Sequence, residues 1–129
     1  MSRDYGVVPD ATLLSYQVLD PTSRVGDDCS FRNNLRLTDL SSLINHAIND
    51  GASIINYSSS TRAQGNDLKW AIARAMNQGV LITASVGNNA TDENSTHLSQ
   101  WSGVVGVSAI DTDGKFASYS SWGEGVTTT

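Results

Sequence analysis

The chain has little cysteine, few basic residues and no long apolar run, and each shortage excludes a class of function. Cys29 is the only cysteine among 129 residues, so an intrachain disulfide and a zinc site built on paired thiolates are excluded. The 8 Lys and Arg are scattered and outnumbered by 13 Asp and Glu, which argues against nucleic acid as a partner. No apolar run approaches the roughly 20 residues that span a bilayer, so a membrane partner is not expected.

The compartment cannot be read from the sequence. Residues 1–5 lack the apolar core of a signal peptide, so the chain as written shows no export route. Its length and its 39% hydrophobic content fit one ordinary globular domain over residues 1–129. The connection from Asp20 to Leu37 is polar and without periodicity, which predicts a surface loop and no internal domain boundary.

Two segments repeat one pattern, in which an amphipathic helix is followed by a glycine and a short apolar strand. The first helix is capped by Thr38 or Asp39 and ends at Gly51, and residues 53–56 follow as a buried strand. The second helix is capped by Asn66 and ends at Gly79, and residues 80–84 form its strand. The predicted apolar faces are Leu40, Leu43, Ile44, Ala47 and Ile48 in the first helix, and Leu68, Ala71, Ile72, Ala75 and Met76 in the second.

Alternation of helix and apolar strand is typical of βαβ units, whose strands pair in parallel. Further strands are predicted at residues 12–19 and 104–110, and residues 116–120 could fold back as an edge hairpin after the Asp113-Gly114 turn. The predicted fold class is α/β, with three layers and a mostly parallel sheet flanked by helices.

Polar clusters follow two of the predicted strands. Residues 56–60 read Asn-Tyr-Ser-Ser-Ser, and residues 85–89 read Ser-Val-Gly-Asn-Asn. Ligands of open parallel sheets bind beyond the carboxyl ends of the strands. If the two strands are neighbours, about 4.8 Å apart, both clusters face one crevice.

These same residues carry a resemblance to the subtilisin-like serine protease family. Residues 6–11 resemble its G-V-A-P motif, residues 54–58 its I-N-M-S segment and residues 84–89 its A-A-G-N segment. Residues 104–109 and 116–121 resemble the strand and the A-S-F-S or A-S-Y-S continuation that come next. Order and spacing agree across nearly the whole chain, which makes an accidental match improbable.

The resemblance implies roles for particular residues. Asn88 matches the asparagine whose amide helps to form the oxyanion hole. Loss of that donor costs about 2.7–4 kcal/mol of transition-state stabilisation in this very family, a magnitude that comes with the resemblance. Ser58, Ser59 and Ser60 match the strand that pairs with the substrate backbone, and Ala84, Ser85, Val86 and Gly87 match one wall of the pocket for the side chain that precedes the scissile bond.

The three motifs of the catalytic triad are absent from these 129 residues. Such an enzyme needs an orienting Asp, a His base and a Ser nucleophile. The only Asp-Thr pair, Asp111-Thr112, lies in a predicted surface turn; His46 and His97 lack the H-G-T-H context; and no Gly-Thr pair exists to start the nucleophile motif G-T-S. The resemblance begins after the His segment and stops before the Ser segment, as truncation at both ends would produce.

Several residues depart from the family or have an ordinary structural interpretation. Val86 stands where the family usually has Ala, and would add bulk at the pocket wall; Ser59-Ser60 replaces Leu-Gly. His46 is interpreted as a structural imidazole and His97 as a surface histidine. The acidic pairs at 27–28 and 92–93 are interpreted as solvated, so no metal or other cofactor is expected, although the family often binds structural calcium.

The sequence therefore predicts a segment of a subtilisin-like serine endopeptidase that does not hydrolyse peptides by itself. Its partner would be a peptide or protein substrate once the missing segments are supplied. Family members are often secreted. The alternative is a non-catalytic peptide-binding or self-associating pseudoprotease module, since the helices missing from this chain would otherwise cover apolar surface of the sheet.

Overall fold

The computed structural model describes residues 7–16, 39–60, 62–63, 65–93 and 97–129. The chain divides into two units, residues 1–37 and residues 38–129. In the first unit, a turn closes where the Ala11 N–H donates to the Val8 carbonyl at 3.2 Å. Residues 12–16 form no strand, because they make no ladder pairing, so that part of the strand predicted at 12–19 is wrong. Residues 17–19 and the predicted loop at 20–37, with Cys29, lie outside the described residues.

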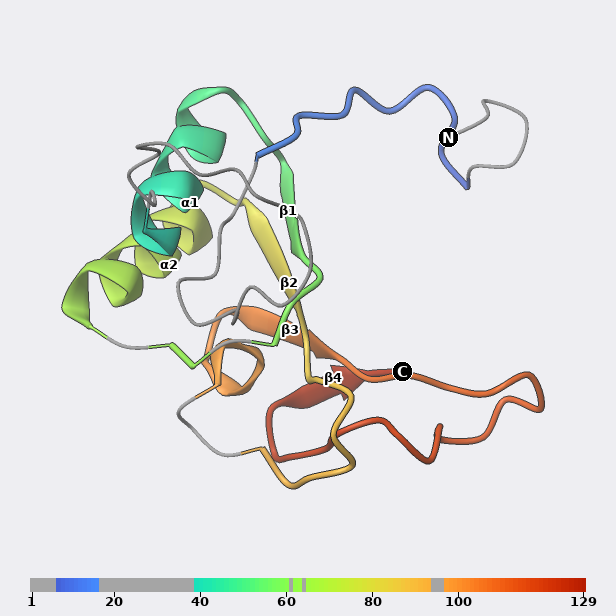
Figure 1. Ribbon diagram of the computed structural model, residues 1–129. Coiled ribbons are helices and arrows are strands. Elements are labelled where there is room, and N and C mark those ends of the chain that lie inside the picture. Colours follow the sequence, from blue (N-terminus) through green and yellow to red (C-terminus); the bar gives the residue numbers. More distant parts are fainter. Residues whose placement is uncertain (1–6, 17–38, 61, 64, 94–96) are drawn as a thin grey trace, which may run out of the picture. The chain divides into compact units, whose positions relative to one another are not determined.

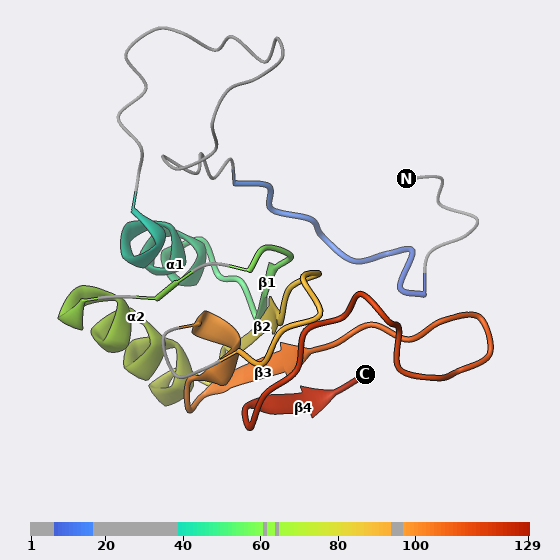
Figure 2. The same cartoon turned by 60° about the horizontal axis from the view of Figure 1, so that its bottom comes forward.

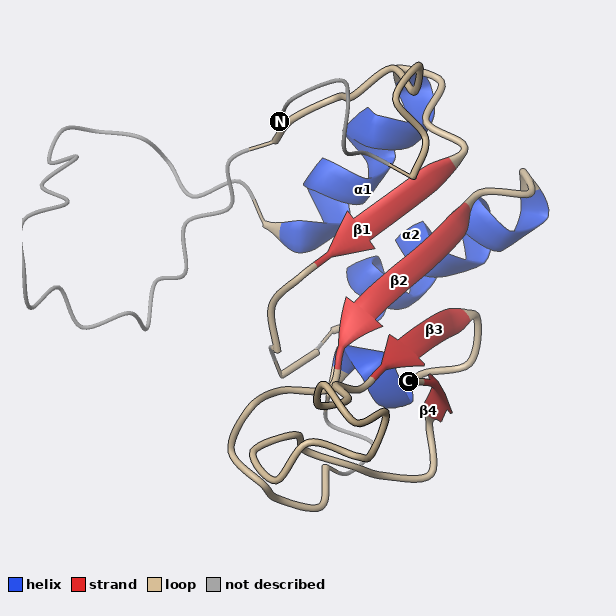
Figure 3. Ribbon diagram, turned by 90° about the vertical axis from the view of Figure 1, so that its right-hand side faces the viewer, coloured by secondary structure: helices blue, strands red, loops and turns tan. Residues whose placement is uncertain are grey.

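The second unit is built on a parallel sheet, as the βαβ pattern predicted. Its strands are β1 (Ile54–Tyr57), β2 (Leu81–Ser85), β3 (Val104–Val107) and β4 (Val126–Thr128), in the spatial order β1-β2-β3-β4. All three pairings are parallel, and Figure 3 shows β1, β2 and β3 running side by side in one direction. The α/β class is thus confirmed.

The carboxyl-terminal part of the sheet differs from the prediction. Strand β4 was not predicted, because the polar run of three threonines around it carries no apolar alternation. The predicted hairpin at residues 116–120 contributes one antiparallel bridge, Ile110 to Phe116, around a turn at Asp113-Gly114 and does not form strands. Figure 1 shows the long connection between β3 and β4 extending beyond the strand ends.

Both predicted helices are present, with one cap placed differently. Helix α1 (Leu40–Asn49) is capped by Asp39, whose carboxylate accepts from the Ser42 N–H at 2.8 Å. Helix α2 (Asn66–Asn77) is capped by the backbone of Gly65, at φ 91°, and Asn66 is the first helical residue, so the prediction that Asn66 caps it was wrong. A short 3-10 helix, η1 (Leu98–Gln100), precedes β3.

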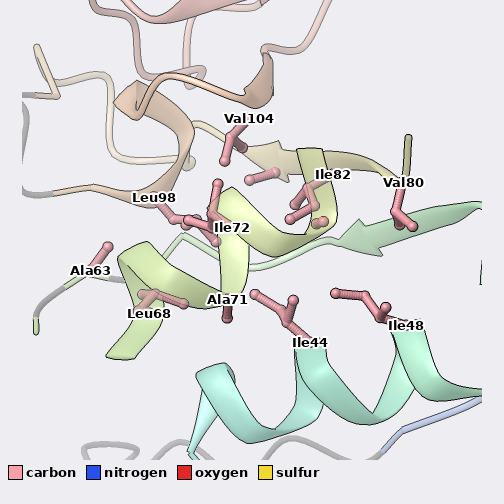
Figure 4. Packing of buried hydrophobic residues seen from close by; sticks show 12 residues of the cluster. Ile44, Ile48, Ala63, Leu68, Ala71, Ile72, Val80, Ile82, Leu98 and Val104 are labelled. Atoms are coloured by element: carbon pink, nitrogen blue, oxygen red, sulfur yellow. The ribbon is translucent and has the colours of Figure 1, made fainter. Parts of the chain in front are cut away.

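The core lies between the sheet and the two helices. Figure 2 shows α1 and α2 together on one side of the sheet, and Figure 4 shows Ile44 of α1 pointing toward Ala71 of α2. Ile82 from β2 and Leu98 from η1 are each 1% exposed within this cluster. Arg74 of α2 ties the helices together, because its guanidinium donates to the Asn45 side chain at 2.8 Å and to that of Asn49 at 2.6 Å.

The other face of the sheet carries no helix among the described residues of the second unit. We call it the open face; it consists of Ile54, Asn56, Leu81, Thr83, Ser85, Val105 and Val107. Strand β1 is the first in the strand order, so it is an edge strand of the described sheet. Ile54 of β1 is 64% exposed, so the prediction that this strand is buried was wrong, and Leu81 of β2 is 45% exposed on the same face. His46 is also exposed rather than packed as a structural imidazole, because it lies on the outer side of α1.

Candidate active site

The two polar clusters meet where β1 and β2 end. Asn56 of β1 is in register with Thr83 of β2, and Tyr57 is in register with Ala84. Figure 3 shows the loops after β2 and β3 gathered beyond the strand ends. Together with the end of β1, they border an open cavity of about 250 Å³. The cavity is lined by Asn56, Ser58, Ala84, Ser85, Gly87, Asn88, Val107, Ser108 and Ala109, so the predicted single crevice is confirmed.

The floor of this cavity is held by side-chain hydrogen bonds between the strands. The Thr83 hydroxyl donates to Oδ1 of Asn56 at 2.9 Å, and Nδ2 of Asn56 donates to Oγ of Ser58 at 2.8 Å. The amide of Asn56 therefore bridges β2 and the start of the Ser58 segment. This fixes where the chain leaves β1.

Gly87 allows the second cluster to turn over the cavity. Its φ of 103° is in the left-handed region that other residues rarely adopt, and an added Cβ would lie 3.0 Å from Oγ of Ser60. The Ser121 N–H donates to the Gly87 carbonyl at 3.0 Å, and the Asn89 N–H donates to Oγ of Ser121 at 3.3 Å. The turn thus depends on a segment more than 30 residues away in sequence.

Asn88 stands exposed at the cavity mouth, between these anchored neighbours. No described residue forms a hydrogen bond with its side-chain amide. The amide can therefore donate to a group placed in the cavity. Such a donor is what an oxyanion hole requires, provided that its backbone is held in place beforehand.

The other predicted site residues occupy different positions around the cavity. Ala84 and Ser85 line it together with Gly87, but Val86 is 1% exposed and is not among the lining residues, so its side chain adds no bulk at this wall. Ser58 lines the cavity as well, whereas Ser59 and Ser60 are exposed outside it. Alternation along β2 explains the contrast between Ser85 and Val86, since neighbouring side chains point to opposite faces.

Three serines of the site were not singled out from the sequence. Ser108 is 8% exposed, and its hydroxyl has no hydrogen-bond partner among the described residues although it borders the cavity. Ser120 and Ser121 are almost fully buried; Oγ of Ser120 accepts from the Ala109 N–H at 3.0 Å and ties the end of β3 to the Ser121 segment. The resemblance of residues 116–121 to the family motif includes Ser120 and Ser121 but implied no role for them.

His97 and Glu93 were predicted to be solvated, and both predictions were wrong. The Glu93 side chain is 7% exposed and that of His97 is 16% exposed, and Nδ1 of His97 lies 2.7 Å from Oε2 of Glu93. This approach is close in distance but outside hydrogen-bond geometry. The backbone holds the pair, because the Glu93 N–H donates to the Trp122 carbonyl at 2.7 Å and His97 forms a bridge with Arg62.

Among the described residues, none of the side chains that line the cavity is ionisable, so none of them is a general base of ordinary type. No cluster of three or more His, Cys, Asp or Glu occurs in the described part of the chain. The acidic pair at 27–28, considered for calcium, lies outside that part. Asp111 lies in a surface turn as predicted, where its carboxylate accepts from the Asp113 and Lys115 N–H groups at 2.9 Å each.

Comparison with known proteins shows the family of this chain. The model of the Subtilase family (peptidase S8) matches residues 4–128. The chain belongs to the subtilase family. The "Thermostable alkaline protease" of Halalkalibacterium halodurans is 33% identical to this subtilase chain over 118 residues, which are 92% of the chain and 30% of that protease.

Solved structures of related proteins share the fold. The prenylagaramide maturation protease PagA superimposes on the subtilase chain with a TM-score of 0.62 at 32% identity, over 72% of this chain and 35% of that one. The PatG macrocyclase in complex with peptide gives 0.57 at 28% identity, over 67% of this chain and 26% of that one. The chain thus spans about a third or less of the relatives it matches. Within the described residues, no helix has the length and apolarity to cross a membrane.

Proposed function

We propose that this chain is a segment of a subtilisin-like serine endopeptidase and that residues 1–129 are part of one peptidase domain. In this proposal Asn88 donates to the oxyanion that forms during peptide hydrolysis. Ser58, Ser59 and Ser60 pair with the substrate backbone, and Ala84, Ser85 and Gly87 contribute to the adjoining pocket, whereas the buried Val86 side chain does not. The match of the Subtilase model to residues 4–128 supports the single domain.

One observation carries the proposal. The Asn88 amide, which has no hydrogen-bond partner among the described residues, stands at the mouth of a cavity whose described lining is uncharged, on a turn that is held by hydrogen bonds to Ser121. A donor whose position is fixed before the reaction stabilises developing negative charge without reorganisation. Donors of this kind stabilise the tetrahedral intermediate of acyl transfer, and the family membership of the chain connects the geometry to that chemistry.

The isolated chain is expected not to cleave peptides. Hydrolysis by a serine peptidase starts when a base removes the proton of the nucleophile. None of the cavity-lining side chains titrates near neutral pH, and the 129 residues contain none of the triad motifs. In this proposal, the Asp, His and Ser come from sequence outside these residues.

The first test is direct. The purified chain is incubated with casein and, separately, with an activated serine-directed phosphonate, and the products are analysed by mass spectrometry. We expect no cleavage and no covalent adduct. Casein cleavage that is lost in Asn88→Ala would overturn the inactivity of the isolated chain.

The second test supplies the missing segments. The 118 matching residues of the Halalkalibacterium halodurans protease are replaced by those of this chain. We expect the chimera to cleave peptides, and Asn88→Ala to lower kcat by about 10²–10³-fold, the magnitude found in this family for the same donor. Asn89→Ala is the matched control, because the exposed Asn89 side chain does not line the cavity. A folded chimera without activity, or equal effects of the two variants, would refute the role of Asn88.

A second candidate is a non-catalytic module that binds an extended peptide or a second copy of itself. The exposed Ser58 to Ser60 segment beside the cavity favours peptide binding, and the open face with Ile54 and Leu81 favours self-association. Gel filtration over a range of concentrations distinguishes the two: association shifts the elution volume, and Ile54→Asp reverses it. Absence of peptide binding at millimolar concentration, together with a monomer at all concentrations, would remove this candidate.

A further inference from the structure

A row of polar groups runs from the Asn88 turn to a buried carboxylate. We call it the relay; it consists of the Asn89 N–H, the hydroxyls of Ser121 and Thr91, and the side chains of Glu93 and His97. The Asn89 N–H lies 3.3 Å from Oγ of Ser121, which is 3.4 Å from Oγ1 of Thr91. Oγ1 of Thr91 is 3.1 Å from Oε1 of Glu93, and the other oxygen of Glu93 is 2.7 Å from Nδ1 of His97.

The hydrogen bonds of the relay run in one direction. An ionised carboxylate only accepts, so Thr91 donates its single hydroxyl proton to Glu93. The Thr91 oxygen can then only accept from Ser121, and the Ser121 oxygen accepts from the Asn89 N–H. Each donor is thereby polarised by the next acceptor, and the carboxylate strengthens the bond at the far end. The contact between the two hydroxyls, at 3.4 Å, is the longest and weakest link.

The carboxylate end of the relay is protected from solvent, whereas Thr91 lies at the protein surface. Glu93 is 7% exposed and His97 is 16% exposed. A buried carboxylate is costly without partners that donate to it or carry opposite charge. The other charged groups on neighbouring segments are Asp92, Arg62, which forms a backbone bridge with His97, and Glu124 near Trp122. Thr91 is therefore the side chain that donates a hydrogen bond to Glu93, and the His97 imidazole lies beside the carboxylate.

The backbone around the relay makes its geometry rigid. The segments 87–93 and 119–122 exchange four main-chain hydrogen bonds: Ser121 N–H to Gly87 C=O at 3.0 Å, Ala90 N–H to Tyr119 C=O at 3.0 Å, Trp122 N–H to Thr91 C=O at 3.0 Å, and Glu93 N–H to Trp122 C=O at 2.7 Å. The relay side chains lie within this framework. These bonds hold the segment of Glu93 and the Asn88 turn against the same neighbouring segment.

We infer that Glu93 is a positioning residue for the Asn88 turn, acting through Thr91 and Ser121. The role of Asn88 in this inference rests on the proposed function, whereas the hydrogen bonds themselves are formed by the chain without substrate. Glu93 accepts from Thr91, Thr91 accepts from Ser121, and Ser121 accepts from the Asn89 N–H, so Glu93 orients the acceptor of that N–H.

The test uses the whole chain in solution and requires no enzymatic activity. The exchange of the Asn89 amide with solvent is followed by NMR. In Glu93→Ala, which removes the acceptor of the Thr91 hydroxyl, we expect exchange about fivefold faster, the factor for one modest hydrogen bond. Glu93→Gln can still accept from Thr91 and should keep the wild-type rate. Wild-type exchange in Glu93→Ala would overturn the inference.

Variants of Thr91 test the connection itself. Thr91→Val removes the hydroxyl that links Ser121 to Glu93, and we expect the Asn89 amide to exchange with solvent about fivefold faster, the factor for one modest hydrogen bond. Thr91→Ser keeps the hydroxyl and should restore wild-type exchange. Thr112→Val, at an exposed turn, is the matched control. Equal exchange in Thr91→Val and Thr112→Val would refute the coupling, and this result does not depend on whether the chimera cleaves peptides.

Discussion

The two faces of the sheet should respond differently to the same substitution. Ile82 and Ile54 lie in neighbouring strands, but Ile82 is 1% exposed toward the helices and Ile54 is 64% exposed on the open face. Replacing Ile by Ala removes three carbon atoms, worth about 2.4 kcal/mol of transfer free energy when fully buried. The cavity left around Ile82 raises its total to about 3–4 kcal/mol, within the usual range for such a change.

The corresponding loss at Ile54 is much smaller. About a third of its surface is buried, so Ile54→Ala should lower the free energy of unfolding by roughly 0.8 kcal/mol, without a cavity term. The two variants should therefore differ by roughly 2–3 kcal/mol. Urea denaturation followed by tryptophan fluorescence measures both. Since Ile82→Ala could unfold a marginally stable chain, Ile82→Val, with an expected loss of about 0.5–1.5 kcal/mol, serves as a milder second variant.

Equal losses at the two positions would refute this assignment of faces. A loss at Ile54 that grows with protein concentration has a different meaning, because oligomerisation makes apparent stability depend on concentration. It would show that a second copy covers the open face. The experiment thus also tests the self-associating alternative.

Three further predictions concern single contacts. Asp39→Ala should destabilise α1 by about 1 kcal/mol at pH 7. Hydrogen bonds from the Ser41 side chain and then the Ser42 backbone hold the pKa of Asp39 below its usual 3.8, so this stabilisation is present above that value and is lost as the pH falls through the lowered pKa. Acid denaturation curves of the variant and the wild type should therefore converge at low pH, and a constant difference between them would contradict the role of the Asp39 carboxylate. Arg74→Met should cost about 1–3 kcal/mol in urea denaturation, because two hydrogen bonds to α1 are lost, and an unchanged midpoint would contradict the tie between the helices. Gly106→Ala should disrupt the pairing of β3 with β4, because the new Cβ would lie 2.6 Å from the Gly125 carbonyl oxygen. Hydrogen exchange should then show lost protection of the amides in these strands. Protection as in the wild type would show that the backbone moves to accommodate the Cβ.

Helical periodicity and the glycine turn after β2 were interpreted correctly from local pattern, whereas the Asn66 cap, the strand at residues 12–16 and the hairpin strands at residues 116–120 were wrong. The helices containing Ile44 and Ile72 were recognised because a buried helical face repeats every three or four residues. The Asn88 turn was located because glycine and polar residues directly follow an apolar strand. The pairing of β1 with β2 made the two polar clusters one site, as the βαβ connection required.

Predictions that depended on remote neighbours were wrong. The strand at residues 53–56 looked buried because it is apolar, yet it lies at the sheet edge, and its Ile54 faces the open side. Glu93 and His97 looked solvated because their sequence surroundings are polar. Glu93 is held by a main-chain hydrogen bond to Trp122 and His97 by a bridge to Arg62, and both partners lie far along the chain.

The sequence by itself determined the α/β class, the family resemblance and the place where polar residues follow the strands, because periodicity and glycine stops act within a few residues. Only the tertiary structure decided which face of the sheet stays open and which side chains hold the Asn88 turn. The burial of a side chain and the partners of its hydrogen bonds depend on segments that are far apart in sequence, as Asn89 and Ser121 are at a separation of 32 residues. No local pattern encodes those contacts.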